Sequence, residues 1–150
     1  MQIRAASPDD SSRCAEIHVL ARGLMSYVPQ THTLAEVLAW KRHVVFPQQE
    51  VWVAEIDREI IGYASLEGKE LTNLYVHPNY QGRGVGTALL VRVQASANEG
   101  LRLWTFQQNE GAVRFYERNG FHNVRTTDGL ENEERLPSCL MSWPSPVVYT

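Results

Sequence analysis

Hydrophobic residues recur with the period of a helix in some stretches of the chain and form short β-branched or aromatic runs in others. The first helix is predicted to begin after Ser7, which can cap it, while Pro8 suits the first helical position and Asp10 completes a capping box. Its inward face is predicted from apolar positions three or four residues apart, namely Cys14, Ile17, Ala21 and Leu24. We expect this helix to end before Pro29.

A second amphipathic helix is predicted where Thr33 precedes Glu36 by three residues and forms another capping box. The apolar positions expected on its inner face are Val37, Trp40 and Val44. Because a proline ring and its missing N–H disrupt helical hydrogen bonding, Pro47 is predicted to terminate this helix.

Seven short β-branched and aromatic runs predict strands at 2–5, 51–56, 60–66, 71–76, 101–106, 121–126 and 139–143. The short links between the second, third and fourth runs predict an antiparallel meander. Between the later runs we expect a long helix from near Gly84 to about Asn98. Another helix is expected over 110–119, closed by Gly120 in a left-handed conformation. The fold class is therefore predicted to be α/β, of the α+β type.

Composition and charge narrow the function classes. At 150 residues the chain is the size of one domain, and 43% hydrophobic with 21% charged residues is typical of a globular protein. A net charge of -3 without any basic run argues against a nucleic-acid partner. No apolar run reaches the roughly 18 residues of a membrane span, and the first residues lack a signal-peptide pattern, so a cytoplasmic location is expected. Scattered histidines and two cysteines, Cys14 and Cys139, predict neither a metal site nor a disulfide.

The segment from His77 to Gly86 lies directly after a predicted strand and directly before a predicted helix. It contains three closely spaced glycines, at Gly82, Gly84 and Gly86. We expect these glycines to adopt left-handed conformations and to let a ligand approach the main chain without meeting a Cβ. The N–H groups at the helix start then form an anion site suited to phosphate. Arg83 can add a positive charge, and the Thr87 hydroxyl can donate to a phosphate oxygen.

The spacing of the glycines in this loop distinguishes between the known phosphate-binding motifs. A Rossmann fingerprint fails because Thr87 stands where the third glycine is required, and a Walker A loop fails because the segment has no lysine. The run Gln81-x-x-Gly84-x-Gly86 instead resembles the signature Q/R-x-x-G-x-G/A of the GNAT N-acetyltransferase family. The preceding Leu74-Tyr75-Val76-x-Pro78 resembles the strand that leads into that signature. The alternative is a glycine-rich turn that only starts a helix.

A second block, from Asn109 to Phe121, resembles the GNAT pattern N-x-x-A-x-x-F/L-Y-x-x-x-G-F. Seven residues make nearly two helical turns, so Asn109 and Tyr116 share one face, about 10 Å apart. In the family the asparagine contacts pantetheine or phosphate and the tyrosine faces the acetyl sulfur, which implies the same roles for Asn109 and Tyr116. The alternatives are a plain helix N-cap for Asn109 and a core aromatic for Tyr116.

The resemblance implies one GNAT domain over 1–150, with a mixed, mostly antiparallel sheet of six or seven strands and about four helices. It implies an N-acetyltransferase that moves the acetyl group of acetyl-CoA, the co-substrate, to a primary amine of a small molecule or peptide by direct attack. Tyr116 is then the catalytic residue. The residues implied to bind acetyl-CoA are Leu74, Tyr75, Val76, Gln81, Gly82, Arg83, Gly84, Val85, Gly86, Thr87, Asn109 and Tyr116. No metal or further cofactor is implied, and a homodimer is allowed.

The base that deprotonates the acceptor amine is left open between Glu70, Glu67 and a water chain, because the strand 103–107 lacks the glutamate that some family members use. The simpler interpretation, which we favour, is that both glutamates are solvated residues at a hairpin end. The acidic residues of 127–137 can attract a cationic amine or simply form a solvated loop. A second function class is a GNAT-fold acyl-CoA sensor or interaction module without catalysis. A nucleotide-binding regulatory domain is disfavoured because its motifs are missing.

Overall fold

The computed structural model describes residues 1–97 and 99–144, which fall into two compact units. Unit 1 spans Met1–Ser96, and unit 2 begins at Ala97. In the described residues, four strands belong to unit 1 and three to unit 2, and the pairings within each unit are antiparallel. The predicted α/β class with mostly antiparallel strands is therefore confirmed.

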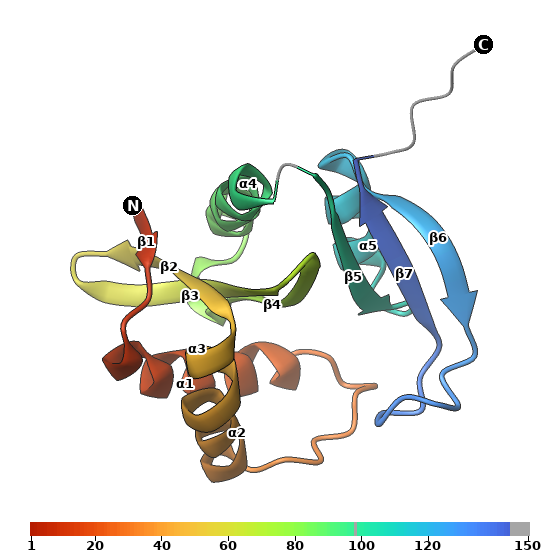
Figure 1. Ribbon diagram of the computed structural model, residues 1–150. Coiled ribbons are helices and arrows are strands. Elements are labelled where there is room, and N and C mark those ends of the chain that lie inside the picture. Colours follow the sequence, from red (N-terminus) through yellow and green to blue (C-terminus); the bar gives the residue numbers. More distant parts are fainter. Residues whose placement is uncertain (98, 145–150) are drawn as a thin grey trace. The chain divides into compact units, whose positions relative to one another are not determined.

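Unit 1 is a four-stranded meander in which each strand pairs with the next (Figure 1). Its strands are β1 (Gln2–Ala5), β2 (Glu50–Ile56), β3 (Glu59–Glu67) and β4 (Glu70–Val76). Its helical elements are η1 (Pro8–Asp10), α1 (Ser11–Gly23), α2 (Leu34–Trp40), η2 (Lys41–Val45), α3 (Phe46–Gln48), η3 (Pro78–Tyr80) and α4 (Val85–Ser96). α1 and α2 lie on one face of this sheet and α4 on the other (Figure 1).

The first helix begins as predicted, because the Asp10 carboxylate accepts the Ser7 N–H at 2.8 Å and a 3₁₀ turn leads into α1. Cys14, Ile17 and Ala21 are buried, as their spacing predicts. The expectation that Leu24 faces inward is wrong, since its side chain is 58% exposed. The reason is that α1 ends at Gly23, so Leu24 already follows the departing chain.

The second helix carries the predicted capping box: the Glu36 N–H donates to Thr33 Oγ1 at 3.2 Å, and the Thr33 N–H donates to Glu36 Oε1 at 3.0 Å. The prediction that Pro47 terminates it is wrong, because the chain continues without a break through η2 and α3 to Gln48. η2 is a π-helical turn, which adds one residue to the turn and shifts the facing positions that follow.

The inner face of the second helix differs in part from the prediction. Val37 is buried as predicted, but Trp40 is 41% exposed and Val44 is only half-buried. Lys41 and Val45 are buried instead, at intervals of four from Val37. Lys41 lies one α-helical turn after Val37, so the ordinary period of α2 places this lysine inside unit 1, and only the position of Val45 follows the π-helical turn.

The faces of the meander sheet are packed differently. On the side of α1, the core joins Cys14, Ile17, Val45, Val51, Val53, Ile60 and Tyr63. On the side of α4, Gly62 allows a close approach. A Cβ at Gly62 would lie 3.1 Å from Val85 Cγ1 and 3.2 Å from Leu89 Cδ1. Gly62 thus sets how closely the first turn of α4 rests on β3.

Replacing Gly62 by alanine is expected to destabilise the fold by about 1–3 kcal/mol, because the new methyl group must displace its neighbours. A Cβ there would also lie 3.1 Å from the Tyr75 carbonyl oxygen, which cannot move without distorting β4. Urea denaturation measures the change. Gly23→Ala is the matched control, since a Cβ at Gly23 meets no atom within 4 Å. Equal effects of the two substitutions would contradict the close-packing role of Gly62.

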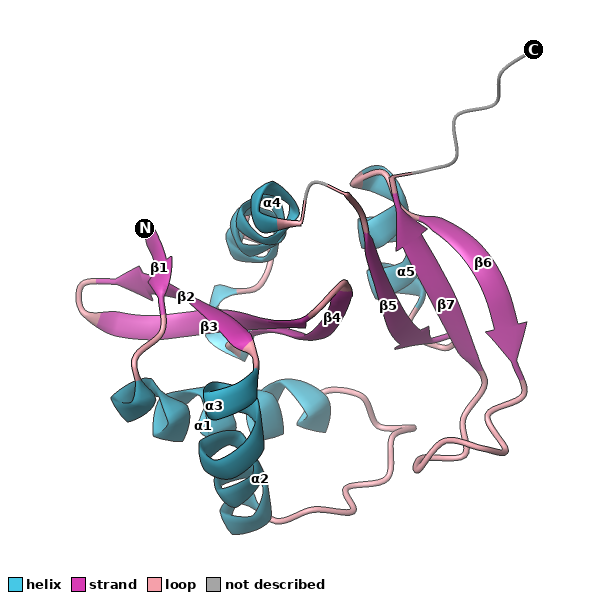
Figure 2. Ribbon diagram, in the orientation of Figure 1, coloured by secondary structure: helices cyan, strands magenta, loops and turns pink. Residues whose placement is uncertain are grey.

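Unit 2 contains three strands in the order β5, β7, β6, with a helix against them (Figure 2). Its elements are β5 (Leu101–Phe106), α5 (Glu110–Arg118), β6 (His122–Thr127) and β7 (Ser138–Trp143). Gly120 closes α5 with a φ of 92°, as predicted. The predicted end of the long helix at Asn98 lies outside the described residues, and α4 extends to Ser96.

Both cysteines are buried thiols without a disulfide. Burial raises the pKa of Cys14 to about 12.

Across residues 1–97 and 99–144, no helix is both long and apolar enough to cross a membrane. Over the same residues, no group of three or more His, Cys, Asp or Glu side chains could hold a metal ion.

Candidate functional site

The loop after β4 begins with a turn centred on His77. The His77 N–H donates to the Ile61 carbonyl oxygen at 2.8 Å, which ties the end of β4 to β3. The Asn79 N–H donates to His77 Nδ1 at 3.1 Å and caps the short helix η3. His77 is therefore a turn residue. This turn directs the chain toward the start of α4.

Two of the three loop glycines adopt the predicted left-handed conformation. The φ angle is 77° at Gly82 and 81° at Gly84. An added Cβ at either glycine would meet no atom within 4 Å, so neither is required by packing against the protein. The prediction is wrong for Gly86, which lies in the first turn of α4 without a positive φ. The two left-handed glycines leave the outer side of the loop open.

The first N–H groups of α4 have no hydrogen-bond acceptor within residues 1–97 and 99–144. The first hydrogen bond of the helix runs from the Ala88 N–H to the Gly84 carbonyl oxygen, at 3.0 Å. Within the residues that the structure describes, none of the amides of 82–87 donates to another group. Val85 is buried and fixes this turn on the core. Unpaired amides at the positive end of a helix dipole are suited to bind an anion such as phosphate.

Side chains around the loop add charge and rigidity. Gln81 Nε2 donates to the Val76 carbonyl oxygen at 3.2 Å, so this side chain braces the loop against the end of β4. The Arg83 guanidinium lies 5.4 Å from the centre of the Tyr80 ring. Arg83 and Thr87 are exposed beside the unpaired amides, where a phosphate can reach them. The loop is thus a cationic, donor-rich turn.

β4 pairs with β3 along the residues that precede the loop, with Leu74 opposite Ala64 and Val76 opposite Gly62. The pairing contains a bulge: Ser65 lies opposite Asn73 and Leu66 opposite Leu71, so Thr72 is an extra residue on β4. A bulge bends its strand and increases the local twist. The strand that precedes the loop is therefore bent in its first half.

In unit 2, Asn109 caps α5, since its Oδ1 accepts the Ala112 N–H at 3.1 Å. The N-cap interpretation is confirmed, and a contact with coenzyme A stays a prediction. Tyr116 is 9% exposed and packs edge-on against Phe115 and Phe121, with ring centres 5.2 and 5.4 Å away. The ring of Tyr116 thus belongs to the aromatic core of unit 2, while the role of its hydroxyl stays a prediction.

The proposed bases and the acidic segment lie at the surface of their units. Glu67 ends β3 opposite Glu70, which begins β4, and Gln49 Nε2 donates to Glu67 at 3.0 Å. In 127–137, Asn132 organises the loop by donating to the Leu136 carbonyl oxygen at 2.8 Å. The exposed acids of this loop are Asp128, Glu131 and Glu133. No pairing in the described residues selects one of these carboxylates as a base.

Sequence reasoning missed a buried polar cluster between α1, η2, β3 and β4. His18 Nδ1 and the Tyr63 hydroxyl share a hydrogen bond of 3.0 Å, and the His18 ring lies 4.8 Å from the Tyr75 ring. An Arg22 N–H donates to the Tyr75 hydroxyl at 3.4 Å. Lys41 completes the cluster. Its spacing of four residues from Val37 is a sequence signal for an inward position, but a charged residue is not expected in a core.

Burial changes the titration of this cluster. It lowers the pKa of Lys41 to about 7, although the Cys14 thiol acts in the opposite direction. It also lowers the pKa of His18 to about 3, with further contributions from the charges of Lys41 and Arg22. The Tyr63 hydroxyl, which is fully buried, has its pKa raised. His18 is therefore neutral at pH 7, and Lys41 changes charge close to that pH.

The free energy of unfolding is expected to rise between pH 7 and pH 9 because of Lys41. Its pKa is about 7 in the folded chain and ordinarily 10.5, so the unfolded chain binds more protons in this range and lower pH favours unfolding. One group gives a slope of at most about 1.4 kcal/mol per pH unit. Urea denaturation of the wild type and of Lys41→Met measures it. The same slope in both proteins would contradict the expectation.

Sequence comparisons with known proteins identify the family that the glycine loop indicates. The family model for the acetyltransferase (GNAT) domain matches residues 47–123. Among curated proteins, the peptidyl-lysine N-acetyltransferase YiaC of Escherichia coli (strain K12) is 38% identical over 94 residues, which are 62% of this chain and 62% of that protein. The chain thus spans less than two thirds of the length of YiaC.

Solved structures agree in fold. The structure of yncA from Salmonella typhimurium with its cofactor acetyl-CoA has a TM-score of 0.76 at 24% identity, and the match covers 100% of this chain and 96% of that one. Apo YjaB from Escherichia coli has a TM-score of 0.77 at 22% identity, covering 97% and 98%. These likenesses confirm the predicted fold. Because the family model matches half of its residues, the chain belongs to the GNAT acetyltransferase family.

Proposed function

We propose that this protein is an acetyl-CoA-dependent N-acetyltransferase that acetylates a primary amine of a small molecule or peptide. The observation that carries the proposal is the set of unpaired amides over 82–87, because they form a phosphate site where the family binds its coenzyme. The relative yncA was solved with acetyl-CoA, and YiaC is a peptidyl-lysine N-acetyltransferase. Both names favour an enzyme over an acyl-CoA sensor without catalysis.

The coenzyme is proposed to bind along β4 and the loop. The amides of Gly82 to Thr87 hold the diphosphate, and Arg83 adds a charge-assisted contact. The main chain of Leu74, Tyr75 and Val76 pairs with pantetheine as an added strand would. Gln81 supports the loop through its bond to Val76, and Asn109 contacts the pantetheine or phosphate portion. The bulge at Thr72 favours this arrangement, because it bends the strand that must receive the ligand.

Tyr116 is proposed to assist departure of the thiolate. A thiol ionises near pKa 8.5 and a phenol near 10, so complete proton transfer from Tyr116 to the sulfur is uphill by roughly 2 kcal/mol. A hydrogen bond donated in the transition state requires no complete transfer and still stabilises the developing charge. The packed ring of Tyr116 suits this role, because it fixes the direction of the hydroxyl.

The acceptor amine attacks as a neutral group, so a base or a water chain must take its proton. Glu70, Glu67 and a water chain stay the candidates for this base.

Residues 1–150 are proposed to act as one domain, since the family model runs from 47 to 123 and crosses the boundary between the units. The two free, buried thiols favour a reducing compartment such as the cytoplasm.

The experiment that tests the function is thiol release from acetyl-CoA in the presence of amine panels: polyamines, amino acids, aminoglycosides, N-terminal peptides and lysine peptides. We expect at least one panel to accelerate thiol release above hydrolysis, with a mass gain of one acetyl group on the amine. Tight acetyl-CoA binding without turnover in any panel would favour the sensor. Absence of acetyl-CoA binding would overturn both functions.

A further inference from the structure

Lys41 is a buried amine whose only contacts with charge-stabilising groups in the described part of the chain are two aromatic rings. Its side chain is 0% exposed, and within the described residues its Nζ has no hydrogen-bond partner. The nearest groups are aromatic faces: Nζ lies 4.6 Å from the centre of the Tyr63 ring and 4.9 Å from that of Trp40. Aromatic faces stabilise a cation only in part, and an unpaired buried ammonium is strongly disfavoured. The position therefore lacks a negative group.

Among the described residues, no carboxylate contributes to the pKa shift of Lys41. α1 contributes Cys14, His18 and Arg22 to this cluster, and β3 and β4 contribute Tyr63 and Tyr75. The charges that act on His18 are those of Lys41, Arg22 and His32, all of them cationic when charged. Only the Cys14 thiol influences Lys41 in the opposite direction, and burial keeps that thiol neutral. A cationic ligand such as a polyamine would be repelled here, and an anion would be attracted.

The cluster touches the strand that is proposed to receive the coenzyme. Tyr75 belongs to that part of β4, and its ring and hydroxyl contact His18 and Arg22. The cluster therefore lies on the α1 side of β4, the side away from α4. Trp40, at the surface, covers Nζ from outside, and its ring lies 6.3 Å from that of His18. Because Nζ is fully buried, a ligand can reach it only when this ring is displaced or the lysine side chain turns.

We propose that Lys41 is the counter-charge for a carboxylate of the acceptor, so that the acceptor is a small amine that also carries a carboxylate, such as an amino acid. The inference rests on the proposed acetyl transfer and names its substrate class. In the complex, the Lys41 ammonium donates to the carboxylate beside the ring of Tyr63. The carboxylate stabilises the charged form of Lys41, which the empty cluster disfavours.

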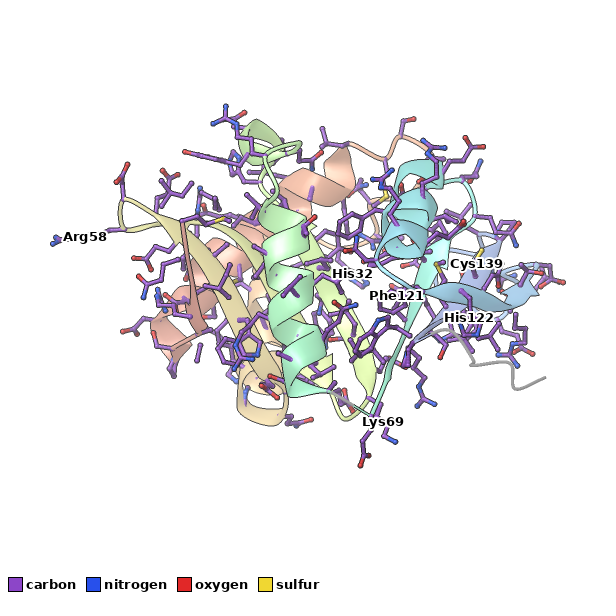
Figure 3. All side chains as sticks on the ribbon, turned by 90° about the horizontal axis from the view of Figure 1, so that it is seen from above. His32, Arg58, Lys69, Phe121, His122 and Cys139 are labelled. Carbon is purple, nitrogen blue, oxygen red and sulfur yellow. The ribbon has the colours of Figure 1, made fainter. Side chains whose placement is uncertain are left out.

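The chain contains only two lysines, Lys41 and Lys69, so NMR of protein labelled with ¹³C at lysine Cε gives two signals. Lys69 lies at the β3–β4 turn and is exposed (Figure 3), which makes it an internal control. The probes are the common L-amino acids, each compared with its amide, which keeps the amine and removes the negative charge. We expect at least one amino acid to shift the Lys41 signal and raise its pKa, while Lys69 and the matching amide show no such response.

Two variants complete the test, with Lys69→Met as the matched control for Lys41→Met. Methionine keeps the length of the side chain without its charge, and Lys41→Met is expected to fold, because Nζ makes no hydrogen bond. For the responding amino acid, Lys41→Met should weaken binding and lower kcat/KM roughly 10- to 100-fold, the loss of one charge-assisted hydrogen bond. Lys69→Met should change neither value.

Failure of this assignment is distinguishable from failure of the proposed function. Equal responses to every amino acid and its amide, or equal effects of the two variants, would overturn the carboxylate site even if acetyl transfer to other amines is observed. A Lys41-specific response without thiol release would support the carboxylate site and overturn the acetyltransferase.

Discussion

Alanine in place of Gly84 is expected to weaken acetyl-CoA binding at least 100-fold. Gly84 has a φ of 81°, and a Cβ there would meet no protein atom within 4 Å, so the new methyl group projects into the space over the unpaired amides. A diphosphate pushed away from this loop loses two or more charge-assisted hydrogen bonds, each worth about 1.5–3 kcal/mol. Every 1.4 kcal/mol corresponds to about a tenfold change in affinity. Calorimetric titration with acetyl-CoA measures the loss.

Gly68→Ala is the matched control for this substitution. Gly68 has a φ of 60° in the β3–β4 turn, and a Cβ there also meets no atom within 4 Å. Both substitutions impose the same left-handed strain, about 1–2 kcal/mol of stability, which urea denaturation measures. Only Gly84→Ala should lower the affinity. Equal affinities of the two variants would show that the coenzyme does not approach Gly84.

Tyr116→Phe is expected to lower turnover roughly 100-fold with little change in the affinity for acetyl-CoA, because a positioned proton donor typically contributes at least this much. The substitution removes the hydroxyl and keeps the ring that packs against Phe115 and Phe121. Steady-state kinetics with a responding amine, together with calorimetric binding of acetyl-CoA, separates the two effects. A melting temperature within a few degrees of the wild type confirms that the core is intact. Unchanged turnover would remove Tyr116 from the chemistry.

The features that the sequence predicts well depend on few neighbouring residues. The capping boxes at Ser7 and Thr33, the antiparallel meander of β2, β3 and β4 and the left-handed Gly120 each depend on contacts between residues close in the sequence. The glycine loop belongs to the same class, since its conformation follows from glycine spacing after a strand. The left-handed conformation was wrongly predicted for Gly86. This residue lies in the first turn of α4, where the backbone does not require a positive φ.

Features that depend on contacts between distant parts of the chain could not be predicted from the sequence. We predicted Trp40 and Val44 on the inner face, but Lys41, one helical turn after Val37, is buried, and the π-helical turn at η2 places Val45 in the core. No local signal marks such a turn, because it forms where packing against α1 and the sheet favours it. For the same reason, the contacts of Tyr75 with His18 and Arg22 could not be predicted. They join residues more than fifty positions apart.

The central claim is that the amides of 82–87 hold the diphosphate of coenzyme A, and amide NMR of the ¹⁵N-labelled protein during titration with acetyl-CoA tests it most directly. We predict saturable downfield shifts of the Gly82 to Thr87 amides, larger than those of the Gly68 amide. Dephosphorylated pantetheine should not reproduce them, because it lacks the diphosphate. Saturation by acetyl-CoA that leaves these amide signals unmoved would contradict the claim.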